Sequence, residues 1–286
     1  MRRLFLHWFV VFALAALASA QTRMVVIGLD GCSPDGVRKA NAPNLAKMRA
    51  QGAWTLRARG VMPTVSSPNW ASMIMGAGPE QHGITSNDWQ PDKFDFPAVF
   101  VGSRGRFPTI FGLMRDQRSK ATIAVIHDWT GFGRLVEPGV ADVIENPKGA
   151  EATVARAIEV WKQRRPELLF VHIDHADHVG HEKGHGTREY YASIGEVDGW
   201  VGRIANATAG AYVLVTADHG GVGKKHGGNT LKELEIPWIL TGPGVARGHE
   251  IQASVNTTDT AATVAHIFQL KAPQAWIGRP VLEAFR

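Results

Sequence analysis

Met24-Val25-Val26-Ile27-Gly28-Leu29-Asp30 is an apolar, largely β-branched stretch that ends in a carboxylate. The chain repeats this arrangement twice: the run Leu168 to Ile173 comes shortly before Asp177, and the run Tyr212 to Ala217 comes directly before Asp218. Apolar runs of this kind are typical of strands buried on both faces of a parallel sheet. Ligands at the carboxyl ends of such strands lie in the crevice where open α/β sheets place their active sites.

Around these strand ends, a set of acidic and histidine residues has the composition of a two-metal site. Its members are Asp30, Asp177, His181, Asp218, His219 and His226. Mixed oxygen and nitrogen ligands suit zinc, whereas an all-oxygen set favours magnesium or calcium. Taken singly, each residue could instead be a helix cap or a structural histidine. The combination favours the metal site, because seven of the chain's twelve histidines fall between His172 and His226.

The rest of the sequence alternates between predicted strands and predicted helices. This alternation predicts a three-layer α/β/α sandwich with a mostly parallel, doubly wound central sheet. No internal repeat or long polar linker interrupts residues 21–286, so we expect one domain. Further strands are predicted at Trp54 to Gly60, Ala121 to His127 and Pro237 to Leu240, and helices at Pro43 to Gln51, Pro108 to Gln117, Ala150 to Arg164, Thr187 to Asn206 and, capped by Asp259, Thr260 to Leu270.

The first twenty residues have the pattern of a secretory signal peptide. Arg2 and Arg3 precede an apolar stretch from Leu4 to Leu17, and Ala18-Ser19-Ala20 fits a cleavage site. The apolar stretch is short for a membrane span, so the pattern favours cleavage over a retained anchor. We therefore expect a periplasmic or secreted protein with no permanent membrane anchor, whose catalytic domain comprises residues 21–286.

Charge and cysteine content argue against a nucleic-acid-binding module and against a scaffold held by internal disulfides. Without Arg2 and Arg3, the formal net charge falls from +5 to +3, with 29 basic and 26 acidic residues. This small surplus, with no block of lysine and arginine, argues against a nucleic-acid-binding module. The single cysteine, Cys32, cannot form an internal disulfide, so export does not imply a disulfide scaffold.

A hydroxyl-rich segment narrows the chemistry. Met62-Pro63-Thr64-Val65-Ser66-Ser67-Pro68-Asn69-Trp70 follows a predicted strand, and Pro68 suits the first turn of a helix. A serine at that helix start lies close to free N–H groups and to the positive end of the dipole, which favours bound phosphate and an ionised hydroxyl. From this segment alone, Ser66 or Ser67 is equally well interpreted as a helix N-cap.

The order of these motifs resembles the alkaline phosphatase superfamily and, within it, the nucleotide pyrophosphatase/phosphodiesterase (type I phosphodiesterase) branch. That branch has a hydroxyl nucleophile, one residue and Pro-Asn, followed by a Pro-Glu-x-His-Gly-Ile stretch and an Asn. The matching segments are Ser66-Ser67-Pro68-Asn69, Pro79-Glu80-Gln81-His82-Gly83-Ile84, Asn87, Asp177-His178-Val179-Gly180-His181, Asp218-His219-Gly220, His226-Gly227-Gly228 and Gly278-Arg279-Pro280.

The resemblance implies an alkaline phosphatase-like fold, two zinc ions (or other divalent metals) and a small-molecule phosphate ester as substrate. It implies that Ser66 is the nucleophile and that Asn87 donates to a phosphoryl oxygen. One zinc would be held by Asp30, Ser66, Asp218 and His219, and the other by Asp177, His181 and His226. The branch usually has threonine where Ser66 stands, which leaves Thr64 and Ser67 as further candidates. Only six residues separate His219 from His226, so the insertion that helps form the family's cap is nearly absent.

We therefore predict an exported, zinc-dependent phosphoric ester hydrolase that acts as a phosphodiesterase or nucleotide pyrophosphatase through a phosphoserine intermediate. A phosphomonoesterase on the same site is the alternative. A non-catalytic zinc-binding protein is a third possibility, but it leaves Ser66 and Asn87 unexplained. A sulfatase is disfavoured, because the Cys/Ser-x-Pro-x-Arg context of its modified residue is missing.

Five polar residues near the predicted ligands lie outside the matched pattern. They are His175, His178, His185, Lys224 and Lys225. We expect the histidines to support the ligands or to lie on the surface, because metal ligands usually need hydrogen-bonding partners. The two lysines belong either to a solvated loop or to the phosphate site, where they would favour a monoester.

Overall fold

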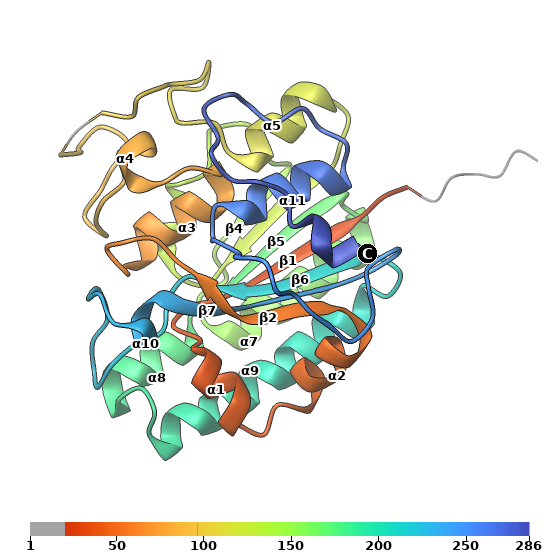
Figure 1. Cartoon of the computed structure of the whole chain (residues 1–286). Coiled ribbons are helices and arrows are strands. Elements are labelled where there is room, and N and C mark those ends of the chain that lie inside the picture. Colours follow the sequence, from red (N-terminus) through yellow and green to blue (C-terminus); the bar gives the residue numbers. More distant parts are fainter. Residues whose placement is uncertain (1–20, 96, 286) are drawn as a thin grey trace, which may run out of the picture.

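An eight-stranded sheet forms the centre of the structure, a computed structural model that describes residues 21–95 and 97–285 (Figure 1). The predicted signal peptide at residues 1–20 lies outside the described residues. In the order β4-β3-β5-β1-β6-β7-β2-β8, the sheet contains β1 (Met24–Leu29), β2 (Ala53–Arg59), β3 (Ile123–His127), β4 (Val143–Glu145), β5 (Leu168–Ile173), β6 (Tyr212–Ala217), β7 (Glu235–Thr241) and β8 (His249–Glu250).

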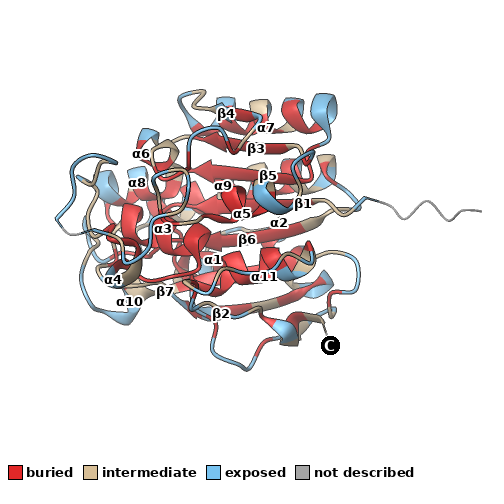
Figure 2. Ribbon diagram, turned by 90° about the horizontal axis from the view of Figure 1, so that it is seen from above, coloured by how far each residue is buried: buried red, intermediate tan, exposed pale blue. Residues whose placement is uncertain are grey.

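The three apolar runs that end near carboxylates are neighbours in the middle of this sheet. β1 lies between β5 and β6 and is parallel to both. Leu29, the last residue of β1, is level with Ile173 and Ala217. The residues that follow these three strands therefore emerge side by side at one edge. Figure 2 shows that the central strands are almost wholly buried, as their sequences, apolar except for His172 in β5, predict.

β7 is the exception to the parallel arrangement, since it is antiparallel to β6 and to β2. An antiparallel strand begins at the edge where its neighbour ends, so the chain needs no crossover between β6 and β7. The connection at residues 218–234 consequently stays at the carboxyl edge of β6. The other paired strands are parallel, which confirms the predicted α/β fold with a mostly parallel sheet.

Helices cover both faces of the sheet (Figure 1). On one face lie α3 (Ser66–Met75), α4 (Pro79–His82), α5 (Ile110–Gln117) and α11 (Asp259–Ile267). On the other lie α1 (Pro34–Lys39), α2 (Pro43–Gln51), α7 (Ala150–Arg164), α8 (His175–Lys183), α9 (Arg188–Ala207) and α10 (Leu231–Leu234). The short α6 (Thr130–Gly133) follows β3, and a 3-10 helix spans Leu282–Phe285. In the described part of the chain, no helix combines the length and apolar character of a membrane span.

One helix was missed by the prediction, and another begins one residue earlier than predicted. Residues 175–183 form α8, which was not predicted because this histidine-rich segment buries only Ala176, Asp177 and Gly180 and has no apolar stripe. Asp259 is the first residue of α11, and Thr258 occupies the cap position that was predicted for Asp259. The helix predicted at Thr187 to Asn206 corresponds to α9, whose buried residues include Ile194, Val197, Val201 and Ile204.

Candidate metal centre

The carboxyl edge of the central strands brings the predicted ligands together from five segments. Asp30 directly follows β1, and the pair Asp218 and His219 directly follows β6. Asp177 and His181 are four residues apart on α8, which places them on the same face of the helix. His226 lies in the connection between β6 and α10, and Ser66 is the first residue of α3.

One group of ligand atoms surrounds His219. Its Nε2 lies 3.2 Å from Ser66 Oγ, 3.2 Å from Asp218 Oδ2 and 3.5 Å from Asp30 Oδ1. All four side chains are buried. The ligand atoms of Asp30, Asp218 and His219 lie within 4.8 Å of one another, close enough to share one ion.

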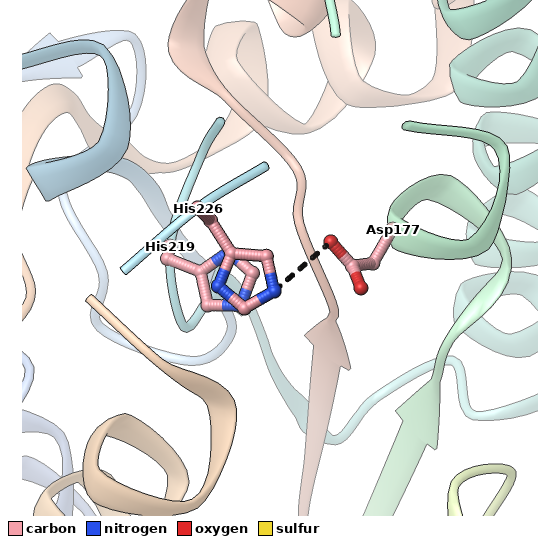
Figure 3. Close-up of side chains that lie close together, drawn as sticks. All are labelled: Asp177, His219 and His226. Carbon is pink, nitrogen blue, oxygen red and sulfur yellow. Dashed lines mark ion pairs between the residues drawn. The ribbon is translucent and has the colours of Figure 1, made fainter. Parts of the chain in front are cut away.

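The second group surrounds Asp177. Asp177, His219 and His226 offer ligand atoms within 4.8 Å of one another, and Figure 3 shows the two imidazoles facing the carboxylate. His226 Nε2 lies 3.9 Å from Asp177 Oδ1 and 3.1 Å from His181 Nε2. His181 Nε2 is in turn 3.2 Å from Asp177 Oδ2. The rings of His219 and His226 stack with centroids 3.8 Å apart, so His219 joins the two groups.

Hydrogen bonds at Nδ1 turn the Nε2 atoms of the three imidazoles toward the candidate site. Each Nδ1 faces a backbone carbonyl oxygen, which can only accept, so Nδ1 carries a proton and each imidazole in its neutral form has its lone pair on Nε2. The pairs are His219 with Gly220 (2.8 Å), His226 with Thr64 (2.9 Å) and His181 with Lys224 (3.0 Å).

In Asp30 and in Asp218, one carboxylate oxygen accepts hydrogen bonds from the protein and the other has no hydrogen-bond partner. Asp30 Oδ2 accepts from Trp70 Nε1 at 3.0 Å and lies 3.1 Å from His172 Nε2. Asp218 Oδ1 accepts from the backbone N–H groups of Gly31 and His219. The other oxygens, Oδ1 of Asp30 and Oδ2 of Asp218, are buried without a hydrogen-bond partner, as is Oδ1 of Asp177. An unpaired buried polar atom costs about 1–3 kcal/mol, so this donor set fits bound cations.

The pKa values reflect the crowding of negative charge. Burial raises the pKa of Asp30 and of Asp218 well above the usual 3.8, and the charge of neighbouring carboxylates raises both further. Burial also opposes ionisation of Asp177, but its hydrogen bond with His181 and the nearby imidazoles lower its pKa to about 2. The same hydrogen bond raises the pKa of His181 to about 9. Converging carboxylates of this kind need positive charge between them.

Sequence reasoning missed three residues that complete this centre. Trp70 and His172 hold Asp30, and neither has a local signal, because both contacts are long-range. Asp174 follows β5 as Asp30 follows β1, and its carboxylate lies within 4.8 Å of those of Asp30 and Asp177. This parallel between β1 and β5 could have identified Asp174.

The three unassigned histidines have different environments. The side chain of His185 is buried, with Nε2 3.7 Å from Asp177 Oδ1. Its ring lies against Gly180 and Gly221, where any Cβ would approach the imidazole to 2.4 and 2.3 Å. His175 and His178 instead pair with surface glutamates, Glu196 at 2.7 Å and Glu182 at 3.3 Å respectively.

Of the candidate hydroxyl groups, Ser66 is the one that faces the ligands. Val65 occupies the N-cap position of α3, and no side chain caps this helix, so the N-cap interpretation of the serines is wrong. Thr64 Oγ1 donates to the Gly228 carbonyl at 2.7 Å. Ser67 Oγ accepts from Arg134 at 3.2 Å, and Ser67 N donates to Asn87 Oδ1 at 2.8 Å.

The fold, this cluster of acids and imidazoles and a family match over most of the chain together place the chain in the alkaline phosphatase superfamily. The family model for type I phosphodiesterase / nucleotide pyrophosphatase matches residues 24–231, and the chain belongs to that family.

Individual relatives are distant in sequence and longer than this chain. An uncharacterized pyrophosphatase/phosphodiesterase of Schizosaccharomyces pombe is 25% identical over 224 residues, which cover 70% of this chain and 45% of that protein. Venom phosphodiesterase 2 of Crotalus adamanteus is 23% identical, covering 70% and 27% respectively. Human ectonucleotide pyrophosphatase/phosphodiesterase family member 1 is 24% identical, covering 62% and 21%. The chain thus spans less than half the length of these relatives.

Solved structures show the same fold. Murine ectonucleotide pyrophosphatase/phosphodiesterase 5, solved as an inactive variant in complex with AMP, matches with a TM-score of 0.74 at 15% identity, covering 88% of this chain and 96% of that one. A 2-O GAG sulfatase matches with a TM-score of 0.71 at 13% identity, covering 93% and 74%.

Proposed function

We propose that this chain is an exported, zinc-dependent phosphoric ester hydrolase that acts as a phosphodiesterase or nucleotide pyrophosphatase. Residues 21–286 would form its single catalytic domain after removal of the signal peptide. The observation that carries the proposal is the position of Ser66, whose Oγ lies 3.2 Å from His219 Nε2 among buried carboxylates and imidazoles. Family membership supports a phosphate ester or anhydride as the substrate.

Seven side chains would hold two divalent metal ions. The mixture of oxygen and nitrogen atoms suits zinc, although other divalent metals can bind such sets. When bound, the ions would stabilise the charge on the phosphoryl oxygens and the ionised form of the serine hydroxyl. Asp30, Ser66, Asp218 and His219 would hold one ion, and Asp177, His181 and His226 the other.

The proposed reaction has two steps at Ser66. In the first, Oγ forms a bond to phosphorus while the bond from phosphorus to the leaving oxygen breaks, and the serine proton ends on the leaving group. The product of this step is a phosphoserine. In the second, water attacks phosphorus, Oγ departs and regains a proton, and the phosphate product is released.

Two N–H donors are available to the phosphoryl oxygens. The backbone N–H of Ser66 makes no hydrogen bond within the described residues, and Pro68 in the same turn has none to offer. The side chain of Asn87 accepts from Ser67 N through Oδ1, so its Nδ2 is the group left to donate. Fixed donors at a helix start stabilise the negative charge that develops during attack.

Replacing Ser66 by alanine tests this assignment. We expect Ser66→Ala to keep its metal content while kcat falls by several orders of magnitude, as covalent nucleophile deletions usually do. Ser72→Ala is the matched control, because Ser72 is on the same helix and its Oγ lies 3.0 Å from a different imidazole, His82 Nε2. The wild-type protein should also lose activity in chelator and regain it with zinc. Turnover by Ser66→Ala close to that of the control would reject the proposal.

A further inference from the structure

Arg134 lies beside the proposed nucleophile, although no motif in the sequence marks it. It directly follows the short helix α6. Its Nη2 donates to the backbone oxygen of Asn87 and to Ser67 Oγ, the latter at 3.2 Å. The guanidinium therefore binds the two segments that carry Ser66 and Asn87.

These contacts form a closed set of hydrogen bonds. Asn87 Oδ1 accepts from Ser67 N at 2.8 Å, and Arg134 contacts both residues. Ser67 is fully buried, so its Oγ cannot exchange Arg134 for water. Because Arg134 donates to the backbone oxygen of Asn87, it also fixes the position of the Asn87 backbone and, through it, of the side-chain amide.

Among the described residues, Arg134 has no carboxylate in direct contact, and Asp88 acts on its charge only at longer range. Within residues 21–95 and 97–285, no carboxylate forms an ion pair with Arg134, whereas Arg104 and Arg115 each have one such partner and Arg156 has two. Its guanidinium carbon lies 5.6 Å from the centre of the Trp129 ring, and its Nε is buried without a partner. Guanidinium groups remain protonated in proteins, so a full positive charge stays in this position.

We propose that Arg134 determines how this site ranks phosphate esters by charge, because it positions Asn87 and Ser67 and holds a positive charge in contact with the residue that follows Ser66. The inference rests on the function proposed above. A phosphate monoester carries close to two negative charges at neutral pH, whereas a diester carries one. A nearby positive charge stabilises the more negative group more strongly. Arg134 therefore raises activity on monoesters relative to diesters.

Two substitutions separate the charge from the hydrogen bonds. Arg134→Gln removes the charge, and Arg134→Lys keeps it but cannot hold two acceptors in the fixed geometry of a guanidinium. Arg118→Gln is the matched control, because Arg118 is also half-buried, donates to a backbone oxygen (of Phe268, at 2.5 Å) and lies over an aromatic ring. The substrates are p-nitrophenyl phosphate and bis(p-nitrophenyl) phosphate, which release the same leaving group.

We expect Arg134→Gln to lower the monoester-to-diester ratio of kcat/KM roughly tenfold, as the loss of one nearby charge in a partly solvated site implies. Arg134→Lys should keep that ratio within about threefold of wild type while kcat falls for both esters. Arg118→Gln should change neither quantity. Melting temperatures of all variants show whether each one is folded.

Either of two results would overturn the role of Arg134 alone. One is an unchanged ratio in Arg134→Gln, in a protein whose wild type is active and whose Ser66→Ala variant is not. The other, available even if Arg134→Gln does not fold, is Arg134→Lys with wild-type kcat on both esters. A wild-type protein with bound metal and no activity on either ester would overturn this inference together with the proposed function.

Discussion

Replacing Trp70 by phenylalanine would isolate one hydrogen bond to a proposed metal ligand. The indole Nε1 donates to Asp30 Oδ2 at 3.0 Å, and Trp70 is fully buried. Phenylalanine keeps an aromatic ring in contact with Phe132 and Phe170 but has no N–H. Asp30 Oδ2 would then keep only His172, 3.1 Å away, as a donor. The carboxylate would be less firmly oriented toward the metal.

The expected loss of metal affinity follows from two independent ranges. A hydrogen bond to a charged group contributes about 1.5–3 kcal/mol. Removing the partner of a metal ligand typically weakens metal binding about 10–100-fold, which corresponds to roughly 1.4–2.7 kcal/mol. We therefore expect Trp70→Phe to bind zinc about 10–100-fold more weakly in competition with a chromogenic chelator. Activity should fall at limiting zinc and recover when zinc is in excess.

Trp161→Phe provides the control for the change in side-chain size. Trp161 is also fully buried, but its Nε1 has no hydrogen-bond partner, so the substitution removes volume without removing a hydrogen bond. Both variants should lose stability through packing, and only Trp70→Phe should lose zinc affinity. If the two bound zinc within a factor of about two of each other, the argument that Trp70 orients Asp30 would be refuted.

Two further predictions concern metal content and stability. His181→Gln should lose about one metal ion per chain and most activity, because its Nε2 lies close to both Asp177 and His226. Elemental analysis checks this against the control His178→Gln, whose imidazole pairs with Glu182, and equal metal content in the two variants would contradict it. Asp198→Ala should lower the free energy of unfolding by about 3 kcal/mol. The Asp198 carboxylate accepts hydrogen bonds from Asn44 N, Asn44 Nδ2 and Leu45 N at the start of α2. It takes the place of a helix cap, because no side chain of the N-cap residue caps α2. Thermal denaturation measures the loss, with metal content as the control, and an unchanged melting temperature would disprove the role of Asp198.

Strands with uniform apolar sequence were predicted most accurately. β1 and β5 have the predicted bounds, because each is buried on both faces and both are apolar except for His172. β7 was predicted as a strand, but a strand sequence by itself carries no direction, and only its pairing shows that it is antiparallel. α8 was missed, because a helix with few buried residues has no apolar period to detect. The four-residue spacing of Asp177 and His181 was its available signal.

Within the candidate site, local motifs identified the residues that the structure brings together, and they missed the residues that hold them. Asp30, Asp218 and His219 each stand next to a strand end, where the sequence indicates their direction. Trp70 and Arg134 act through contacts with segments distant in sequence. A single sequence contains no trace of such pairings, because each depends on how α3 and α6 pack against the sheet.

The connection between β6 and β7 explains how this chain completes the candidate centre with so short a segment after His219. The segment leaves β6 at the site and returns antiparallel without crossing to the opposite edge. It lies so close to its surroundings that a Cβ at Gly220 would approach the Lys232 carbonyl oxygen to 2.1 Å. His226 is held in turn by the Thr64 carbonyl, two residues before Ser66. The selectivity proposed above is assigned to a different part of the site, because Arg134 contacts Ser67 from the end of α6 and not from this connection.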